Sequence, residues 1–191
     1  MSSLDNLLAD LTSGDESRAE AAASQLAQLG DSALIPLKGL LDLSDADHRW
    51  WAVRTLAQIP DVDAGLFLTA LSDSSVEVRQ AAALALATHP LEEAAPLLVR
   101  ALNDADSMVQ TLAANALIAI GRSVVPILLG ALDAVPQSAQ IQIMRALAEM
   151  RDHRAIPAML KATESNSVML NYWANEGLER LGLNMVYIKP E

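Results

Sequence analysis

The stretch DSSVEVRQAAALAL, from Asp73 to Leu86, begins with small polar residues and continues as an alanine-rich segment. Aspartate and serine are common N-caps of helices, and alanine and leucine are strong helix formers. Ala82, Ala85 and Leu86 share one side of such a helix, the spacing of a buried amphipathic face. The stretch therefore predicts a polar turn followed by a helix with one buried side.

The same arrangement recurs along the whole chain. Five leucines fall 30, 30, 31 and 30 residues apart, and each period pairs a short apolar segment, often with a proline, with a turn and an alanine-rich segment. No segment alternates with period two, so no sheet is expected. The pattern predicts six helical hairpins, whose second helices cover 16–29, 47–59, 75–89, 105–120, 136–150 and 167–181.

One column of the aligned second helices always holds leucine. From the second repeat on, the position just before this leucine is small, and three residues after it His89 interrupts an otherwise apolar column. Small side chains allow neighbouring helices to approach closely, and stacked hairpins share a core that none could form alone. The leucine column consists of Leu26, Leu56, Leu86, Leu117, Leu147 and Leu178.

These turn-and-helix motifs, DSSVEVRQAAALAL, DADSMVQTLAANAL and DADHRWWAVRTLAQ, resemble HEAT repeats. The short period is similar to the HEAT-like repeats of phycobilisome bilin lyases. The resemblance implies an all-α, right-handed α-solenoid whose second helices line a concave, partner-binding side. The arginine of the motif, present as Arg49 and Arg79, is replaced by Gln110, Gln140 and Asn171. We expect a single array over residues 1–182 and a separate tail over 183–191.

Composition excludes several classes of function. The net charge of −11 argues against binding to nucleic acid or an anionic membrane, and the absence of cysteine excludes disulfides and thiolate chemistry. The start of the chain lacks the features of a signal peptide, and no apolar run is long enough to span a bilayer. These features predict a soluble, cytoplasmic protein.

Two of the six aromatic residues, Trp50 and Trp51, stand side by side. Adjacent helical residues point about 100° apart, so Trp50 is expected to face outward and Trp51 to wedge against a neighbouring repeat. Packing, capping of the array and a small-molecule pocket remain alternatives for this pair. The expected partner-binding residues on the outward side are Trp50, Arg54, Gln80, Asn115, Arg145, Tyr172 and Glu176.

A second set of residues is expected to be structural. Trp173 occupies the column of Trp51 and is expected to pack between repeats in the same way. The motif arginines are expected to bind aspartates or carbonyl groups of the turns between helices. This structural set consists of Trp51, Trp173, Arg49, Arg79, Asp73 and Asp104.

The sequence shows no constellation typical of catalysis, and no cofactor is expected. His48, His89 and His153 lie in different repeats, which argues against a metal site. We expect a non-enzymatic adaptor that binds a segment of a partner protein on the concave side. The resemblance implies an alternative, a bilin lyase subunit or a chaperone-like factor for phycobiliproteins that acts with a second subunit.

The tail is unusually apolar for the end of a chain, with Met185, Val186, Tyr187 and Ile188 in succession. Solenoids need their last hydrophobic face covered. The tail is therefore expected to cap the sixth hairpin or, alternatively, to dock on another copy of the chain or on a partner.

Overall fold

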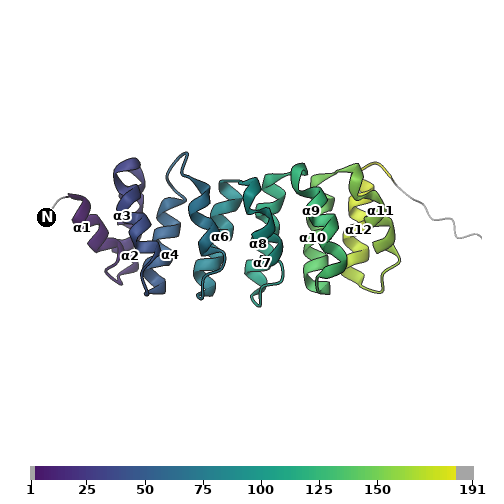
Figure 1. The fold of residues 1–191 in the computed structure, drawn as a ribbon, viewed down its shortest axis with the longest axis horizontal. Coiled ribbons are helices and arrows are strands. Elements are labelled where there is room, and N and C mark those ends of the chain that lie inside the picture. Colours follow the sequence, from purple (N-terminus) through teal and green to yellow (C-terminus); the bar gives the residue numbers. More distant parts are fainter. Residues whose placement is uncertain (1–2, 184–191) are drawn as a thin grey trace, which may run out of the picture. The chain divides into compact units, whose positions relative to one another are not determined.

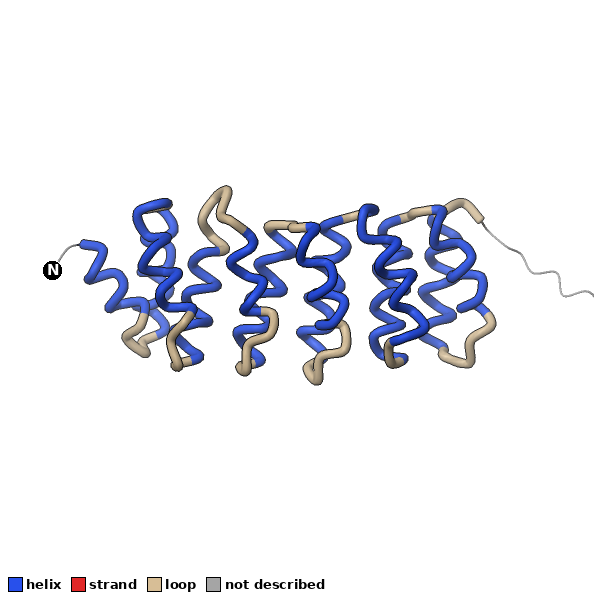
Figure 2. The backbone as a smooth tube through the Cα atoms, in the orientation of Figure 1, coloured by secondary structure: helices blue, strands red, loops and turns tan. Residues whose placement is uncertain are grey.

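The computed structural model describes residues 3–183, and in this part of the chain helices joined by short loops are the only regular structure, without a strand (Figures 1 and 2). The chain divides into two compact units, Met1–Ala94 and Ala95–Glu191. The expected all-α fold of repeated helical pairs is confirmed. The tail residues Met185, Val186, Tyr187 and Ile188 lie outside the described residues, and the single array over 1–182 stays a prediction.

The first unit contains three first helices, α1, α3 and α5, each followed by a second helix. The second helices α2, α4 and α6 lie side by side, and each also packs on the helix before it. The elements are α1 (Ser3–Leu11), α2 (Glu16–Gln28), α3 (Asp31–Leu41), α4 (Ala46–Leu56), the 3₁₀ turn η1 (Ala64–Leu66), α5 (Phe67–Ala70), α6 (Val76–Thr88) and η2 (Glu92–Ala94).

The second unit repeats this arrangement. Here α8, α10 and α12 are neighbours, with α7 packed on α8 and α11 on α12. The elements are α7 (Ala95–Ala101), α8 (Ser107–Ile120), η3 (Arg122–Val124), α9 (Val125–Ala131), η4 (Leu132–Ala134), α10 (Gln137–Met150), η5 (His153–Ala155), α11 (Ile156–Thr163) and α12 (Val168–Arg180). In both units the second helices agree with the expected ranges to within three residues at each end.

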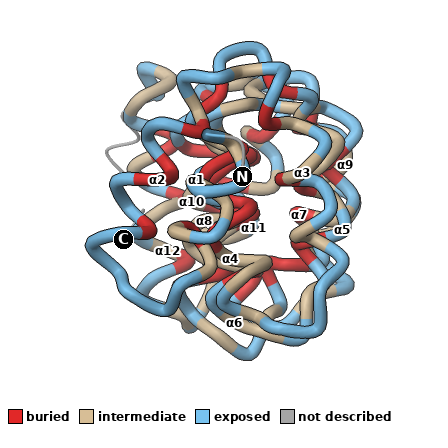
Figure 3. Tube along the Cα trace, turned by 90° about the vertical axis from the view of Figure 1, so that its left-hand side faces the viewer, coloured by how far each residue is buried: buried red, intermediate tan, exposed pale blue. Residues whose placement is uncertain are grey.

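The leucine column forms the centre of the core in each unit. Leu26, Leu56, Leu86, Leu117 and Leu147 are fully buried, and the buried positions, red in Figure 3, lie on the inner sides of the helices. From the second repeat on, the preceding column is small because neighbouring helices approach closely there. At Gly177, for example, an added Cβ would lie 2.6 Å from the end of the Met159 side chain and 3.1 Å from the Cβ of Ala148.

A shared hydrogen bond ties each second helix from α4 to α12 to the turn before it. Arg49 donates to the carbonyl oxygens of Leu43 and Ser44 at 2.9 and 2.8 Å. The side-chain amide of Gln110 donates to the carbonyl oxygen of Asp104 at 2.7 Å. The motif arginine and its amide replacements therefore perform the same task. The remaining members of the series are Arg79 to Asp73 and Ser74, Gln140 to Leu132, and Asn171 to Thr163.

His89, which interrupts the apolar column, links two second helices of the first unit. Its Nε2 lies 2.8 Å from the carbonyl oxygen of Ala57, the C-cap residue of α4, and its ring packs near that of Phe67. Carbonyl groups at helix C-termini lack partners within their own helix. His89 therefore supplies a partner for one of these carbonyls.

Thr55 precedes the column leucine of α4, at a position where the four later repeats carry alanine or glycine. Its side chain is fully buried, and its hydroxyl has no hydrogen-bond partner among the described residues. A buried unsatisfied polar group costs about 1–3 kcal/mol. We expect Thr55→Val, which keeps the shape of the side chain and removes the hydroxyl, to raise the free energy of unfolding by about 1 kcal/mol. Urea unfolding of both proteins measures this difference.

The matched control is Thr111→Val, because the hydroxyl of Thr111 donates to the carbonyl oxygen of Ser107 at 2.9 Å. This variant should be neutral or slightly less stable than the wild type. A loss of stability in Thr55→Val would contradict the assignment of Thr55 as an unsatisfied group.

Candidate functional site

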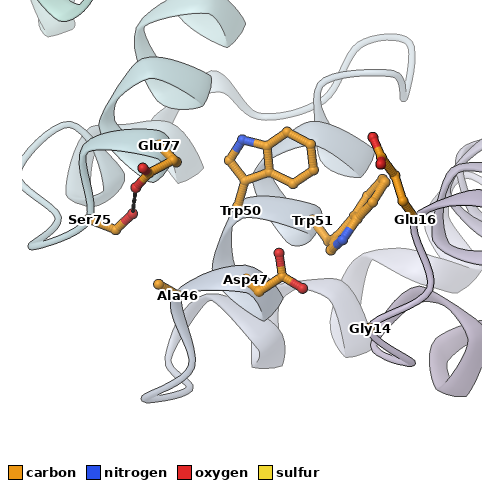
Figure 4. Close-up of a pocket in the computed structure, with 8 residues that line it drawn as sticks. All are labelled: Gly14, Glu16, Ala46, Asp47, Trp50, Trp51, Ser75 and Glu77. Atoms are coloured by element: carbon orange, nitrogen blue, oxygen red, sulfur yellow. Dashed lines mark hydrogen bonds between the residues drawn. The ribbon is translucent and has the colours of Figure 1, made fainter.

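A groove of about 410 Å³ lies at the N-terminal ends of α2, α4 and α6 in the first unit (Figure 4). Each of these ends is capped by a side-chain oxygen, from Asp15, Asp45 and Ser75 respectively. The three caps place the first turns of three neighbouring helices around one opening. We call it the tryptophan groove; its lining residues are Gly14, Glu16, Ala46, Asp47, Trp50, Trp51, Ser75 and Glu77.

The two tryptophans form one wall of this groove. Trp51 is 4% exposed, whereas Trp50 is partly exposed, and their rings meet edge to face with centroids 4.7 Å apart. The guanidinium of Arg54 lies 5.1 and 5.4 Å from the two ring centroids and pairs with Glu20 of α2 at 2.7 Å. Trp51 is therefore a packing residue, and Trp50 is held in place by its neighbours with part of its surface open to the groove.

Three carboxylates surround the tryptophans. Figure 4 shows Glu77 beside Trp50, Glu16 beyond Trp51, and Asp47 below both rings. Glu77 accepts a hydrogen bond from the Ser75 hydroxyl at 2.6 Å. Within residues 3–183, no hydrogen bond or ion pair engages the carboxylates of Glu16 and Asp47.

The corresponding surface of the second unit carries another aromatic pair. Tyr172 is 52% exposed and meets Trp173 edge to face, with ring centroids 5.1 Å apart. Glu176 is engaged by Arg180 at 2.8 Å, and Arg180 also reaches Glu149 of α10. The second unit thus repeats the geometry of the tryptophan pair, with tyrosine in place of the outer tryptophan.

The predicted partner-binding arginines make contacts within the protein. Arg145 donates to the side-chain oxygen of Asn115 at 2.8 Å and to the carbonyl oxygen of Thr111 at 3.3 Å, so it joins α10 to α8. Burial lowers the pKa of the Arg145 guanidinium from its ordinary value. Arg54 joins α4 to α2 in the same column. Gln80, also predicted to bind a partner, lies partly buried on α6 and makes interactions of its own.

Arg49 and Asp73 form a bidentate ion pair with both side chains only 12% exposed. The Nε and Nη2 atoms of Arg49 each lie 2.7 Å from a carboxylate oxygen of Asp73. The carboxylate of Asp73 also accepts a hydrogen bond from the backbone N–H of Ser75 at 2.8 Å. The hydrogen bonds from Arg49 hold the pKa of Asp73 below its usual range. Asp104 accepts from the backbone of Asp106 in the equivalent turn of the second unit.

The carboxylates of the tryptophan groove were not among the residues singled out from the sequence. Acidic residues in the first turn of a helix are common because they suit the helix dipole. The periodic recurrence of an acidic first turn, as Glu16, Asp47 and Glu77, was the available signal. The structure adds that the N-terminal turns of these three helices line the same groove as Trp50.

The described residues show neither a metal cluster nor a single spanning helix. No group of three or more His, Cys, Asp or Glu in residues 3–183 is arranged to hold a metal ion. No single helix there has the length and apolarity to cross a membrane; only Ser107–Ile120 with Arg122–Ala134 passes such a test, as a pair bent by 107°.

The ion pair of Arg49 and Asp73 gives a test of stability and its pH dependence. We expect Asp73→Asn to lower the free energy of unfolding by about 2 kcal/mol at pH 7, between the values typical of exposed and buried pairs. The folded-state pKa of Asp73 lies below the unfolded value of about 3.9. The contribution of the ion pair to the free energy of unfolding is therefore complete above about pH 3.9 and is lost as the pH falls through the folded-state pKa. Urea unfolding at pH 7 and pH 3 measures this difference.

The difference in the free energy of unfolding between the wild type and Asp73→Asn should therefore be smaller at pH 3 than at pH 7. Asp61→Asn, at an exposed position with a positive φ that asparagine tolerates, is the control and should change little. A gap that stays constant between the two pH values would contradict the role assigned to the Asp73 carboxylate.

Two family models match the chain. A model of HEAT repeats matches residues 64–139, and a model of the PBS lyase HEAT-like repeat matches residues 139–165. The chain has no significant sequence match among the curated proteins. The sequence similarity therefore lies in the repeats themselves.

Solved structures with the same fold come from natural and designed proteins. The complex of CpcE and CpcF of phycocyanin lyase from Nostoc sp. PCC7120 matches with 24% identity and a TM-score of 0.59, over 75% of this chain and 96% of that chain. A designed armadillo repeat protein in complex with a (KR)4 peptide matches with 22% identity and a TM-score of 0.57, over 94% and 100%. Human deoxyhypusine hydroxylase in complex with glycerol matches with 17% identity and a TM-score of 0.54, over 94% and 73%. At these identities the likeness concerns the fold alone.

Proposed function

Because this chain is a HEAT-like repeat protein, we propose that it is a non-enzymatic binding module that holds a segment of a partner protein against its second helices. The observation that carries the proposal is the tryptophan groove. A large aromatic side chain with part of its surface open, beside a groove of about 410 Å³, is unusual in a chain with only 3% aromatic residues.

Trp50 has the properties of an anchor for a binding partner. Tryptophan is enriched among the few interface residues that carry most of the binding energy. The edge-to-face contact with Trp51 and the overlying Arg54 fix the ring before any partner arrives. A side chain that is already ordered loses little entropy on binding, which favours affinity.

The second unit offers a further contact surface of the same kind. Tyr172 is exposed and backed by Trp173, as Trp50 is backed by Trp51. Arg145 and Glu176 support this surface through contacts within the protein and are less available to a partner than the sequence suggested. We infer that Trp50 and Tyr172 are the main aromatic contacts of their respective units.

Proteins with the same fold support a binding role. The designed armadillo repeat protein is in complex with a peptide, and CpcE and CpcF form a complex with each other. A stack of helical pairs presents a long surface that changes little in shape when it binds, which suits the capture of a protein segment. This support concerns the general role and leaves the partner to be identified.

The test compares protein partners retained from the native extract by the full chain and by Trp50→Ala. Loss of a hot-spot residue costs at least about 2 kcal/mol, so we expect the specific partner to bind Trp50→Ala at least about thirtyfold more weakly. The partner is then purified and its affinity for both proteins is measured by titration.

Ile35→Ala is the control, because Ile35 is a large apolar residue, 83% exposed, on the first helix α3 rather than in the groove. It should keep full affinity. A Trp50→Ala protein that folds normally and retains every partner would contradict the proposed function.

A second candidate function has an observation in its favour. The match of residues 139–165 to the PBS lyase HEAT-like repeat, together with the likeness to CpcE and CpcF, favours a subunit or chaperone-like factor that handles a bilin on phycobiliproteins. This function predicts that a linear tetrapyrrole changes its visible spectrum and quenches tryptophan fluorescence when the protein is added. The adaptor function predicts neither change.

A further inference from the structure

We propose that the tryptophan groove receives a basic segment of its partner, with an arginine or lysine side chain seated between the indole of Trp50 and the surrounding carboxylates. This inference rests on the proposed function and adds the chemistry of the bound segment. It follows from the distribution of charge, from the unpaired carboxylates and from the ring geometry in the first unit.

The negative charge of the chain is concentrated in the unit that contains the groove. Residues 1–94 hold 15 Asp and Glu against 5 Lys and Arg, a formal net charge of −10. Residues 95–191 hold 9 against 8, a formal net charge of −1. Electrostatic attraction of a basic segment is therefore directed to the first unit, where it also raises the rate of association.

The groove itself places carboxylates around an apolar surface. Asp47 lies below the two rings, with Glu16 and Glu77 on either side (Figure 4). No described residue pairs with the carboxylates of Glu16 and Asp47, so they can pair with a cation without breaking an existing contact. The side chain of a bound arginine or lysine would cover apolar ring surface along its stem and meet these carboxylates with its charged end.

Arg54 shows that a guanidinium fits this pair of rings. It lies over both rings one helical turn beyond Trp50, paired with Glu20. Asp47 lies one turn on the other side of Trp50 and lines the groove. A second cation beside Asp47 would make cation–π and carboxylate contacts of the kind that Arg54 makes, an arrangement more favourable for arginine than for lysine.

The partial positive charges at the N-terminal ends of α2, α4 and α6 oppose the attraction of a basic segment but are too small to cancel it. Each helix N-terminus carries about half a positive elementary charge, or about 1.5 for the three. Five carboxylates stand at these ends, those of Asp15 and Asp45 as caps and those of Glu16, Asp47 and Glu77 in the first turns. The groove therefore remains negative overall.

The arginines near the groove are already engaged. Arg54 pairs with Glu20, Arg49 with Asp73, and Arg18 with Asp10. Arg79 donates to the carbonyl oxygens of the turn before α6. An anionic segment would have to compete for these arginines and would meet the unpaired carboxylates, so the charge pattern selects a cationic segment.

The experiment titrates the full chain, labelled with ¹⁵N, with three peptides that differ only in charge: four repeats of Arg-Gly-Gly, of Glu-Gly-Gly or of Ser-Gly-Gly. The indole N–H signals of Trp50, Trp51 and Trp173 report the site of binding, with Trp50→Phe used for assignment. We expect the arginine peptide to shift the Trp50 signal in a saturable way that weakens with salt, and the glutamate and serine peptides to leave it unchanged.

Two double variants separate the groove from the general acidity of the unit. Glu16→Gln/Asp47→Asn removes the unpaired carboxylates of the groove and should weaken binding of the arginine peptide by about threefold to thirtyfold. Glu92→Gln/Glu93→Gln removes the same charge from exposed positions on η2 and should weaken it less than twofold. Equal weakening by both would overturn the inference.

The remaining outcomes distinguish the inference from the proposed function. If the glutamate or serine peptide shifts the Trp50 signal as strongly as the arginine peptide, the groove binds a segment but does not select a basic one, and only the inference fails. If no peptide shifts it, the inference also fails. The proposed function then stands or falls separately on whether Trp50→Ala loses the natural partner.

Discussion

Within each unit, the structure depends on the burial of one face of each second helix against the neighbouring second helix. A leucine at a constant position is buried in each second helix, and from the second repeat on a small residue just before it lets neighbouring helices approach. No single hairpin can bury this face, so stability arises between repeats. The side of the second helices that points away from the core carries Trp50, which is partly exposed, and Tyr172, which is exposed.

The same packing creates the groove. Because the repeat period keeps neighbouring second helices in step, their N-terminal turns come together in the first unit. Trp51 is almost fully buried, and the side chain before it, Trp50, is partly exposed. The contact between the rings and the overlying Arg54 then orders Trp50 at the surface.

The sequence contained the fold but only part of the site. The leucine column and the capping residues sufficed to locate six second helices, and the helical angle between Trp50 and Trp51 sufficed to separate the surface ring from the buried one. Contacts between helices were not accessible in this way. That Arg54 bridges to Glu20, or that Glu16, Asp47 and Glu77 share an opening, depends on the spacing of helices in three dimensions, which a repeat pattern does not specify.

The central claim is that the partner lies on the indole of Trp50, and cross-linking from that position tests it most directly. A photoreactive benzoylphenylalanine placed at position 50 of the full chain would be irradiated in the native extract and its products mapped by mass spectrometry. The account predicts a cross-link to one segment of a partner protein, with arginine or lysine within a few residues of the cross-linked site. Cross-links confined to the chain itself would contradict it.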